Sequence, residues 1–268
     1  MKKSRLLSLF LTLLLALSLA SPFALAAGES SGSAILDSMV VDAKAAVLVD
    51  PDTDEILYEL NAHEKMYPAS ITKVMTCLLT LEAVDAGQLT LEQTVTASQA
   101  IHTGIGDNAS TADIKAGEEI RIIDLLYAAL LPSANEACNV MAEAVSGDVA
   151  SFVELMNQRA AELGMTGTHF ANTHGYHDDN HYTTAYDVYL MSKEAMKHET
   201  FRTIVSSLNY TMPATNLHPE ERIIRSTNAL ISDFRITGYL YRYATGIKTG
   251  STPEAGYCLA ASATKEDR

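Results

Sequence analysis

Ser70 and Lys73 are two residue types that can do chemistry together. They lie three residues apart in 67-YPASITKVMTCLLTLEAVDAG-87, where the apolar positions after Ser70 recur with helical spacing. Residues three apart share a helix face, so the Lys73 ammonium can reach the Ser70 hydroxyl. A serine needs an adjacent base to become a good nucleophile, and burial can make a lysine that base by lowering its pKa. The interpretation without chemistry is that Ser70 caps the helix and Lys73 extends to solvent.

Two further short motifs follow in the chain. Ser133-Ala134-Asn135 comes directly after Pro132, at a predicted helix start, and Lys248-Thr249-Gly250 lies on a predicted strand just before a turn. Helix starts and strand ends are places where side chains can converge on a cleft. Each motif alone is weak, and Ser133 and Asn135 could simply be a cap and a turn residue. Together and in this order, the three match the motif set of class A β-lactamases and penicillin-binding proteins.

The sequence resembles one family within that set, the serine D-alanyl-D-alanine carboxypeptidases of peptidase family S11, or low-molecular-mass penicillin-binding proteins. The resemblance runs from about Ala45 to Thr264 and includes AAVLVDPDTDEILYELNAHEKMYPASITKVMT and GMTGTHFANTHGYHDDNHYTTAYDVYLMS. It implies a secreted hydrolase that removes the terminal D-alanine from peptidoglycan stem pentapeptides. It also implies covalent inhibition by β-lactam antibiotics and no cofactor.

The expected catalytic residues are Ser70, Lys73 and Ser133. Ser70 attacks the carbonyl between two terminal D-alanines, and Lys73 is its base. Burial, the positive helix end and the second cation at Lys248 would all lower the Lys73 pKa. Ser133 would relay the proton to the leaving amine.

The expected substrate-binding residues are Asn135, Lys248, Thr249, Gly250 and Thr252. Asn135 would hydrogen-bond Lys73 or the substrate amide, and Lys248 and Thr249 would bind the substrate carboxylate. Gly250 would leave room for substrate backbone beside the strand. The resemblance implies that the backbone amides of Ser70 and Thr252 form an oxyanion hole.

A histidine-rich segment, 169-HFANTHGYHDDNH-181, carries the competing metal hypothesis. Its possible zinc ligands are His169, His174, His177, His181, Asp178 and Asp179. The segment lacks two histidines on one helix face, as zinc peptidases of the HExxH type have, and the resemblance supplies such a loop without metal. We therefore expect no metal site and keep a zinc-dependent cell-wall peptidase as the competing hypothesis of a different class.

A β-lactamase and a penicillin sensor would both share the serine centre. A class A-like β-lactamase needs a deacylating glutamate on a loop, followed four residues later by asparagine. Glu154 and Asn157 are three apart within a helical pattern, and the middle motif reads Ser-Ala-Asn rather than Ser-Asp-Asn. Both points favour a peptidase. A non-catalytic penicillin sensor would acylate Ser70 without turning over peptide.

The expected fold is α+β, with one antiparallel sheet built from both chain ends and packed against a helical cluster. A hairpin is predicted over 43–61, and helices over 70–86, 120–131, 132–147, 148–165 and 183–199. Strands are predicted within 221–230, 241–251 and 256–264. The resemblance implies a further sheet strand, an arginine that helps bind the substrate carboxylate, and often a C-terminal domain and membrane-binding helix, all beyond the last residue here.

The N-terminal residues have the basic, apolar, small-residue order of a secretory signal. We expect a signal peptide over 1–26, a flexible lead over 27–38 and the catalytic domain over 39–268, which places the enzyme at the outer face of the bacterial membrane or in the cell wall. The net charge of −14 argues against nucleic acid as a partner. Three scattered cysteines, Cys77, Cys138 and Cys258, are expected to be buried free thiols.

Overall fold

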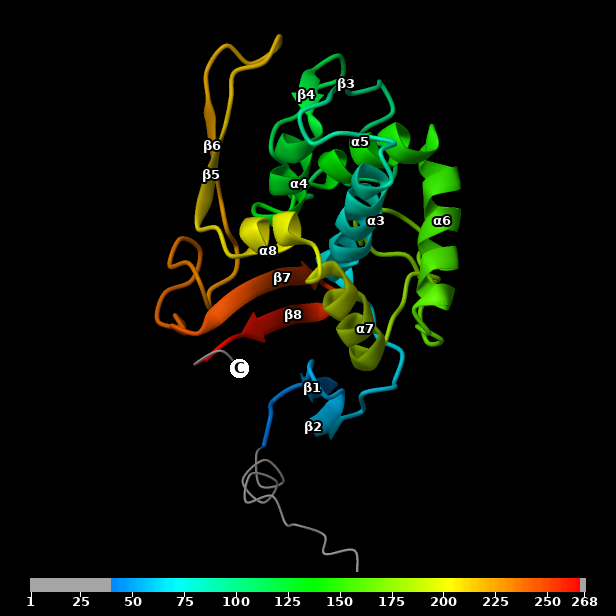
Figure 1. The fold of residues 1–268 in the computed structure, drawn as a ribbon, viewed down its shortest axis with the longest axis vertical. Helices are drawn as coiled ribbons and strands as arrows, with labels where there is room; N and C mark the ends of the chain where they lie inside the picture. The colour runs from blue at the N-terminus through cyan, green and yellow to red at the C-terminus, as the bar shows by residue number, and fades with distance from the viewer. Residues whose placement is uncertain (1–39, 266–268) are drawn as a thin grey trace, which may run out of the picture. The chain divides into compact units, whose positions relative to one another are not determined.

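The computed structural model describes residues 40–265, so the predicted signal peptide and flexible lead lie outside the described residues, as do 266–268 (Figure 1). The predicted α+β class is confirmed, with antiparallel strands at both ends of the described chain and helices between them. The strands are β1 (Ala46–Asp50), β2 (Glu55–Leu60), β3 (Thr94–Thr96), β4 (Glu119–Arg121), β5 (Asn209–Met212), β6 (Arg222–Arg225), β7 (Ala244–Thr252) and β8 (Gly256–Ala263). The helices are η1 (Ala69–Thr72), α3 (Lys73–Asp85), α4 (Ile122–Leu130), α5 (Asn135–Ser146), α6 (Val149–Glu162), α7 (Ala185–Ala195) and α8 (Glu199–Val205).

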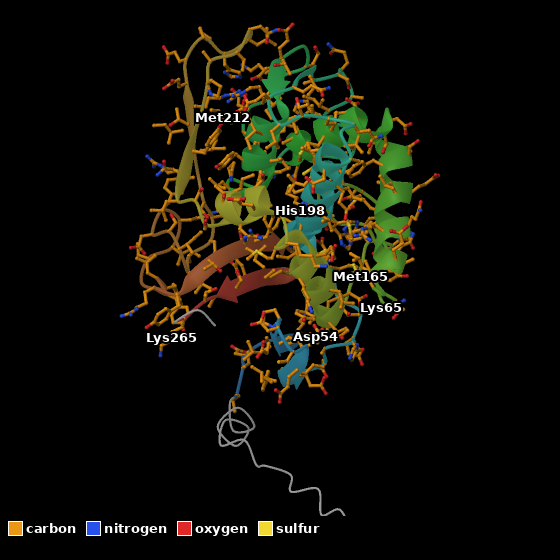
Figure 2. The ribbon with its side chains drawn as sticks, viewed as in Figure 1. Asp54, Lys65, Met165, His198, Met212 and Lys265 are labelled. Carbon is orange, nitrogen blue, oxygen red and sulfur yellow. The ribbon has the colours of Figure 1, made fainter. Side chains whose placement is uncertain are left out.

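The strands pair as four antiparallel hairpins, each a separate two-stranded sheet within residues 40–265. This differs from the single sheet expected from both chain ends, because β1 pairs only with β2 and β7 only with β8 among these residues. Helix α7 contacts both β1 and β8 and so connects the two hairpins. Asp54 lies in the turn of the first hairpin (Figure 2). It accepts a hydrogen bond from Lys193 of α7 at 2.5 Å.

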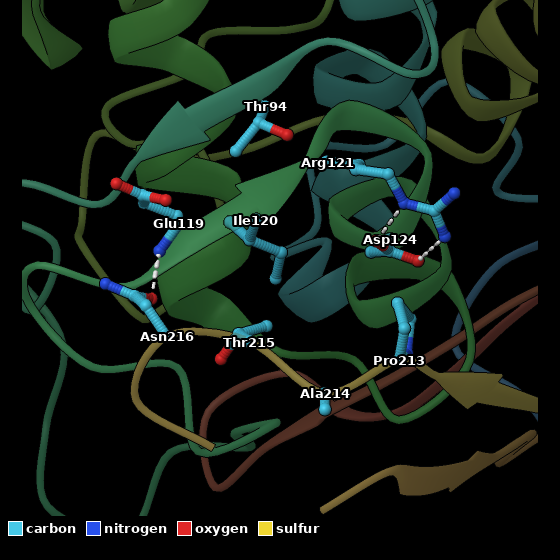
Figure 3. Close-up of a pocket in the computed structure, with 9 residues that line it drawn as sticks. All are labelled: Thr94, Glu119, Ile120, Arg121, Asp124, Pro213, Ala214, Thr215 and Asn216. Carbon is cyan, nitrogen blue, oxygen red and sulfur yellow. Dashed lines mark hydrogen bonds and ion pairs between the residues drawn. The ribbon is translucent and has the colours of Figure 1, made fainter. Parts of the chain in front are cut away.

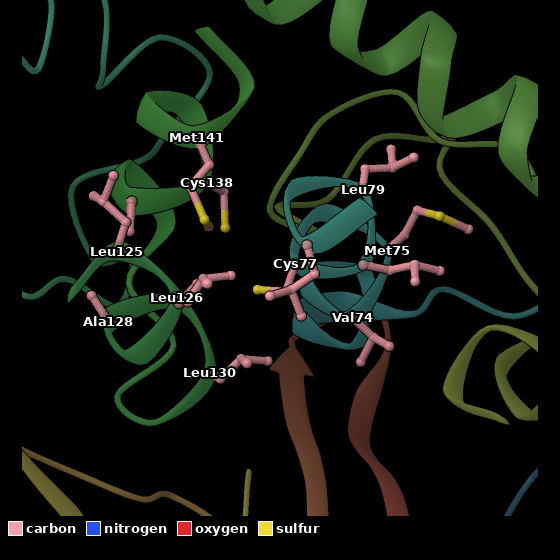
Figure 4. Close-up of a cluster of buried hydrophobic side chains, with 14 of the residues drawn as sticks. Val74, Met75, Cys77, Leu79, Leu125, Leu126, Ala128, Leu130, Cys138 and Met141 are labelled. Carbon is pink, nitrogen blue, oxygen red and sulfur yellow. The ribbon is translucent and has the colours of Figure 1, made fainter. Parts of the chain in front are cut away.

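Helix α3 forms the centre of the helical cluster. It contacts α4, α5, α6, α7 and α8, and its residues from Lys73 to Leu81 are all buried. Figure 4 shows Cys77 of α3 pointing toward Leu126 of α4, while Met75 and Leu79 point to the opposite side of the helix. A helix that is apolar on every side belongs in a core. A lysine at its first position is therefore placed where an ammonium is poorly solvated.

The cysteines are free, as the sequence predicted. Cys77 and Cys138 are fully buried in this core, whereas Cys258 on β8 is only partly buried. Burial raises the pKa of each thiol. The thiols are therefore protonated near neutral pH, which agrees with a packing role.

Several short elements were not predicted. β3, β4 and β5 have three or four residues each, and α8 has seven. Asp148 caps the start of α6, since its side chain accepts a hydrogen bond from the Ser151 N–H at 2.9 Å. Within residues 40–265, the structure contains no helix long and apolar enough to cross a membrane.

Candidate active site

Ser70 lies in η1, one turn before α3 begins at Lys73. Neither helix start has a side-chain cap, so the capping role considered for Ser70 is wrong. The Ser70 hydroxyl instead accepts a hydrogen bond from Lys73 Nζ at 2.9 Å. The residue is half-buried, and its hydroxyl can therefore be reached from outside the protein.

Lys73 is completely buried, so it does not extend to solvent. Its ammonium donates three hydrogen bonds: to Ser70 Oγ, to Asn135 Oδ1 at 2.5 Å and to the His174 carbonyl oxygen at 2.7 Å. All three acceptors are neutral. Burial lowers the pKa of Lys73 to about 8, because removing the ammonium from water is not compensated by a paired carboxylate.

Lys248 is a second buried cation, 1% exposed on β7. Its Nζ donates to the Thr249 carbonyl oxygen at 2.9 Å. Burial, followed by the positive charge of Lys73, lowers the pKa of Lys248 to about 7. The two lysines are thus close enough to repel each other, and an anion bound between them would relieve that repulsion.

Ser133 has a backbone and a side chain that are both unusual. Its φ is +69°, in the left-handed region that non-glycine residues rarely adopt. The residue is 5% exposed, and its Oγ is buried with no hydrogen-bond partner among the described residues. Ser133 does not cap α5, whose N-cap is Ala134. A strained residue with an unpaired buried hydroxyl, two positions before Asn135, has the character of a functional position.

Strand β7 packs directly on η1. A Cβ on Gly250 would lie 2.9 Å from the Ser70 nitrogen and 3.1 Å from the Pro68 carbonyl oxygen. Glycine is therefore required by the contact with the Ser70 backbone, a reason that differs from the expected space for substrate. Thr249 Oγ1 lies 2.6 Å from Thr227 Oγ1, and Thr252 Oγ1 accepts from the Ala255 N–H at 3.0 Å in the turn before β8.

Lys73 thus hydrogen-bonds both Ser70 and Asn135, and Gly250 packs against the backbone of Ser70. Lys248 interacts with Lys73 through charge. Ser133 and Thr252 lie close to members of this group along the chain, and neither side chain hydrogen-bonds Ser70 among the described residues.

The histidine-rich loop contributes a group that the sequence analysis missed, the His174 carbonyl. The next residue, Gly175, has φ +85°, and a Cβ there would lie 1.8 Å from the Ala69 carbonyl oxygen. Only glycine lets the loop approach η1 so closely. The one sequence signal for this contact is the glycine that follows His174.

The same loop gives no support to the zinc hypothesis. Within residues 40–265, no three His, Cys, Asp or Glu side chains are grouped so that they could hold a metal ion. His169 Nδ1 lies 2.6 Å from the Asn180 carbonyl oxygen, and both ring nitrogens of His181 have protein partners.

The β-lactamase hypothesis also lacks support. Glu154 is exposed on α6. The Asn157 side chain is occupied by the Phe170 backbone, donating to its carbonyl oxygen and accepting from its N–H, both at 2.8 Å. These are the contacts of a surface helix and its neighbouring loop.

A pocket lies between the β3–β4 hairpin and residues 213–216, apart from the predicted site residues (Figure 3). Two of its charged side chains, Arg121 and Asp124, are paired: Arg121 donates to Asp124 at 2.8 Å and also to Glu92 at 2.6 Å. Because none of the predicted site residues lines it, this pocket is not part of the candidate active site.

Solved structures identify the class to which this fold belongs. The Streptomyces K15 DD-transpeptidase aligns with a TM-score of 0.76 and 31% identity, over 85% of this chain and 87% of that one. The D-alanyl-D-alanine carboxypeptidase DacD from Francisella tularensis aligns with a TM-score of 0.75 and 25% identity, over 85% and 64%. The fold is that of the DD-transpeptidases and DD-carboxypeptidases, the penicillin-binding proteins.

Within this class, the chain belongs to the D-alanyl-D-alanine carboxypeptidase family (Peptidase S11), whose model matches residues 33–268. It is 37% identical to DacF of Bacillus subtilis strain 168 over 84% of this chain and 54% of that protein. It is 34% identical to DacC of Escherichia coli K12 over 85% and 54%. The chain spans about half the length of these relatives. The family predicted from the sequence motifs is confirmed.

Proposed function

We propose that this protein is a secreted serine DD-carboxypeptidase that removes the terminal D-alanine from peptidoglycan stem peptides. Its activity would lie at the outer face of the bacterial membrane or in the cell wall. Penicillin and other β-lactams would acylate the same serine. The observation that carries the proposal is the 2.9 Å hydrogen bond between Ser70 and a fully buried Lys73 that has no carboxylate partner among the described residues.

Acylation begins when neutral Lys73 takes the proton from Ser70 Oγ. Ser70 Oγ forms a bond to the carbonyl carbon between the two D-alanines, and the oxyanion accepts hydrogen bonds from the backbone N–H groups of Ser70 and Thr252. The C–N bond then breaks. The proton passes from Lys73 through Ser133 to the departing amine, so D-alanine leaves with its charge balanced.

Water completes the cycle by attacking the acyl-enzyme ester. Its proton goes to neutral Lys73 and then to Ser70 Oγ as the ester bond breaks, which restores the starting state. The protonated ammonium of Lys248, with Thr249, binds the carboxylate of the terminal D-alanine. Asn135 positions Lys73 and offers its amide N–H groups to the substrate peptide.

Labelling with a fluorescent penicillin, followed by peptide mapping, tests the proposal. We expect the label on the peptide that contains Ser70, together with release of D-alanine from a stem pentapeptide. Ser70→Ala should lose both, while Ser206→Ala, at an exposed serine, should keep both. The full-length protein is the appropriate sample.

Three outcomes would support the competing hypotheses instead. Loss of pentapeptide turnover on adding a chelator, with Ser70→Ala still active, would indicate a zinc peptidase. Rapid release of penicillin would indicate a β-lactamase. Label on Ser70 without any pentapeptide turnover would indicate a sensor.

A further inference from the structure

His181 is a buried histidine that the proposed mechanism does not use. It lies in the loop between α6 and α7, is 2% exposed and packs edge-on against Phe170 with ring centroids 5.7 Å apart. Its Nδ1 accepts a hydrogen bond from the Ala171 N–H at 3.0 Å. Its Nε2 lies 2.7 Å from Thr72 Oγ1, in the turn that carries Ser70.

These partners determine where the His181 proton lies. A backbone N–H can only donate, so Nδ1 must be unprotonated and the proton of the neutral ring is on Nε2. Nε2–H therefore donates to Thr72 Oγ1. The Thr72 hydroxyl uses its own proton to donate to the Ala69 carbonyl oxygen at 2.8 Å. The result is a directional chain from Ala171 through His181 and Thr72 to Ala69.

The charge state of the ring agrees with this chain. Burial is the largest cause that lowers the pKa of His181, and the charges of His169, Lys73 and His177 act in the same direction against Asp178, so that the pKa is about 4. The ring is neutral at pH 7. A protonated ring would place an N–H at Nδ1 against the Ala171 N–H and break the chain at its first bond.

The chain ends at the residue that precedes Ser70. Ala69 has φ +47°, a left-handed conformation that is strained for a residue other than glycine. Its carbonyl oxygen is held between the Thr72 hydroxyl and the backbone of Gly175. Any relaxation of Ala69 toward a common conformation would rotate the following peptide unit, which contains the Ser70 N–H.

We propose that His181 is a positioning residue for Ser70: its Nε2–H fixes the Thr72 hydroxyl, which holds Ala69 strained and so presents Ser70 and its amide correctly. This inference rests on the proposed role of Ser70 as the nucleophile. It assigns a function to a histidine-rich loop whose composition alone suggested a metal site.

Two substitutions of His181 test the roles of its two ring nitrogens separately. The amide nitrogen of His181→Gln can occupy the position of Nε2 and donate to Thr72, whereas His181→Asn can replace only the Nδ1 end. We expect His181→Asn to lower the first-order rate of Ser70 acylation by penicillin about tenfold, since small misplacements at a reacting centre have large effects. The dissociation constant of the non-covalent complex should stay unchanged. His181→Gln should recover most of the rate.

Thr72→Val removes the next hydroxyl in the chain and should lower the acylation rate to a similar degree. If both residues act through one chain, the double variant His181→Asn/Thr72→Val should be no slower than either single variant. His169→Asn is the matched control, because the ring of this exposed histidine in the same loop hydrogen-bonds only the Asn180 carbonyl oxygen among the described residues, and the acylation rate of this variant should match the wild type.

Nitrogen-15 NMR of the wild-type protein tests the same inference without any activity. We expect the His181 signals of the Nε2–H tautomer, and the Nδ1–H tautomer would overturn the inference. A purely structural role would lower the melting temperature of His181→Asn and His181→Gln alike and leave the acylation rate of the folded fraction unchanged, which would also overturn it. An unlabelled Ser70 in the wild type would overturn the proposed function and this inference together. Labelled wild type with an unaffected His181→Asn would overturn the inference alone.

Discussion

Within residues 40–265, Ser70 is the only hydrogen-bond partner of Lys73 that can return a proton to it. The other two partners of the ammonium, Asn135 Oδ1 and the His174 carbonyl oxygen, are acceptors only. A neutral Lys73 must therefore keep its two N–H bonds toward those oxygens and turn its lone pair toward Ser70 Oγ, 2.9 Å away. Among these partners, Lys73 Nζ can therefore exchange a proton only with Ser70 Oγ.

The first-order rate of acylation by penicillin should rise with pH through the pKa of Lys73. The reactive form is the neutral amine, whose fraction reaches one half at about pH 8 and levels off about one to two pH units above that. Stopped-flow measurements at saturating penicillin between about pH 6 and pH 10 give this profile. Lys73→Arg should lower the rate by about 10²–10⁴-fold, because a guanidinium does not lose its proton. A rate that does not change below about pH 9 would contradict the role of Lys73 as base.

Affinity for a substrate carboxylate should change with pH in the opposite direction. Lys248 binds an anion only while protonated, and its pKa is lowered to about 7, so the dissociation constant should increase as pH rises through 7. Lys248→Met should weaken binding at about pH 6 and remove the pH dependence. Lys115→Met, at an exposed lysine, is the control. Equal affinity at about pH 6 and pH 9 in the wild type would exclude Lys248 as the anion site.

Asn135→Asp should move the pH profile of acylation upward. A carboxylate in place of the amide oxygen at 2.5 Å favours the charged form of Lys73 and raises the pKa of its ammonium. The midpoint should shift to higher pH by at least about one unit, as expected for an opposite charge at contact distance. Asn61→Asp adds the same charge at an exposed residue and should leave the midpoint unchanged. An unshifted Asn135→Asp profile would mean that acylation does not report the Lys73 titration.

Gly250→Ala should separate β7 from η1. The new Cβ would lie 2.9 Å from the Ser70 nitrogen, which is backbone and cannot move aside cheaply. We expect a loss of stability of about 1–3 kcal/mol, typical of overpacking, and a fall in acylation rate. Denaturant unfolding and penicillin labelling measure the two effects, with the exposed neighbour Ser251→Ala as control. A Gly250→Ala variant with normal labelling would show that the two backbones can move apart without affecting Ser70.

The relation between Ser70 and Lys73 could be predicted because it is local: helix geometry brings residues three apart together whatever the rest of the chain does. The His174 contact could not, since it joins Lys73 to a residue 101 positions away through a carbonyl that every residue possesses. The left-handed backbone of Ser133 was equally hidden, because no residue type at that position favours it.

The strands show the same limit. The alternation of apolar and polar residues identified the hairpin over 43–61 and the strands around Lys248 and Cys258. This alternation does not say which strands pair. The expected single sheet was therefore wrong for the described residues. Three-residue strands such as β3 and β4 are too short for any alternation to appear. Gly250 was predicted at the site. The structural reason for a glycine there is its contact with the backbone of η1, which becomes visible only in three dimensions.

Glu118 should be important for stability and not for acylation. Its carboxylate is completely buried and accepts hydrogen bonds from Arg222 of β6, from Thr215 Oγ1 at 3.0 Å and from the Lys115 N–H at 3.0 Å. It thereby attaches the β5–β6 hairpin to the turn before β4. Glu118→Ala leaves the mostly buried Arg222 guanidinium without its carboxylate, and such a broken pair costs about 3–5 kcal/mol.

The surface pair of Lys115 and Asp113 is the matched control, with side chains 54% and 68% exposed and a separation of 3.7 Å. Lys115→Ala should change the free energy of unfolding by about 0–1 kcal/mol. Urea unfolding gives both values, and penicillin labelling of the folded fraction should be normal in each variant, because neither side chain contacts the predicted site residues. A Glu118→Ala variant as stable as Lys115→Ala would mean that the hairpin is held by its apolar contacts alone.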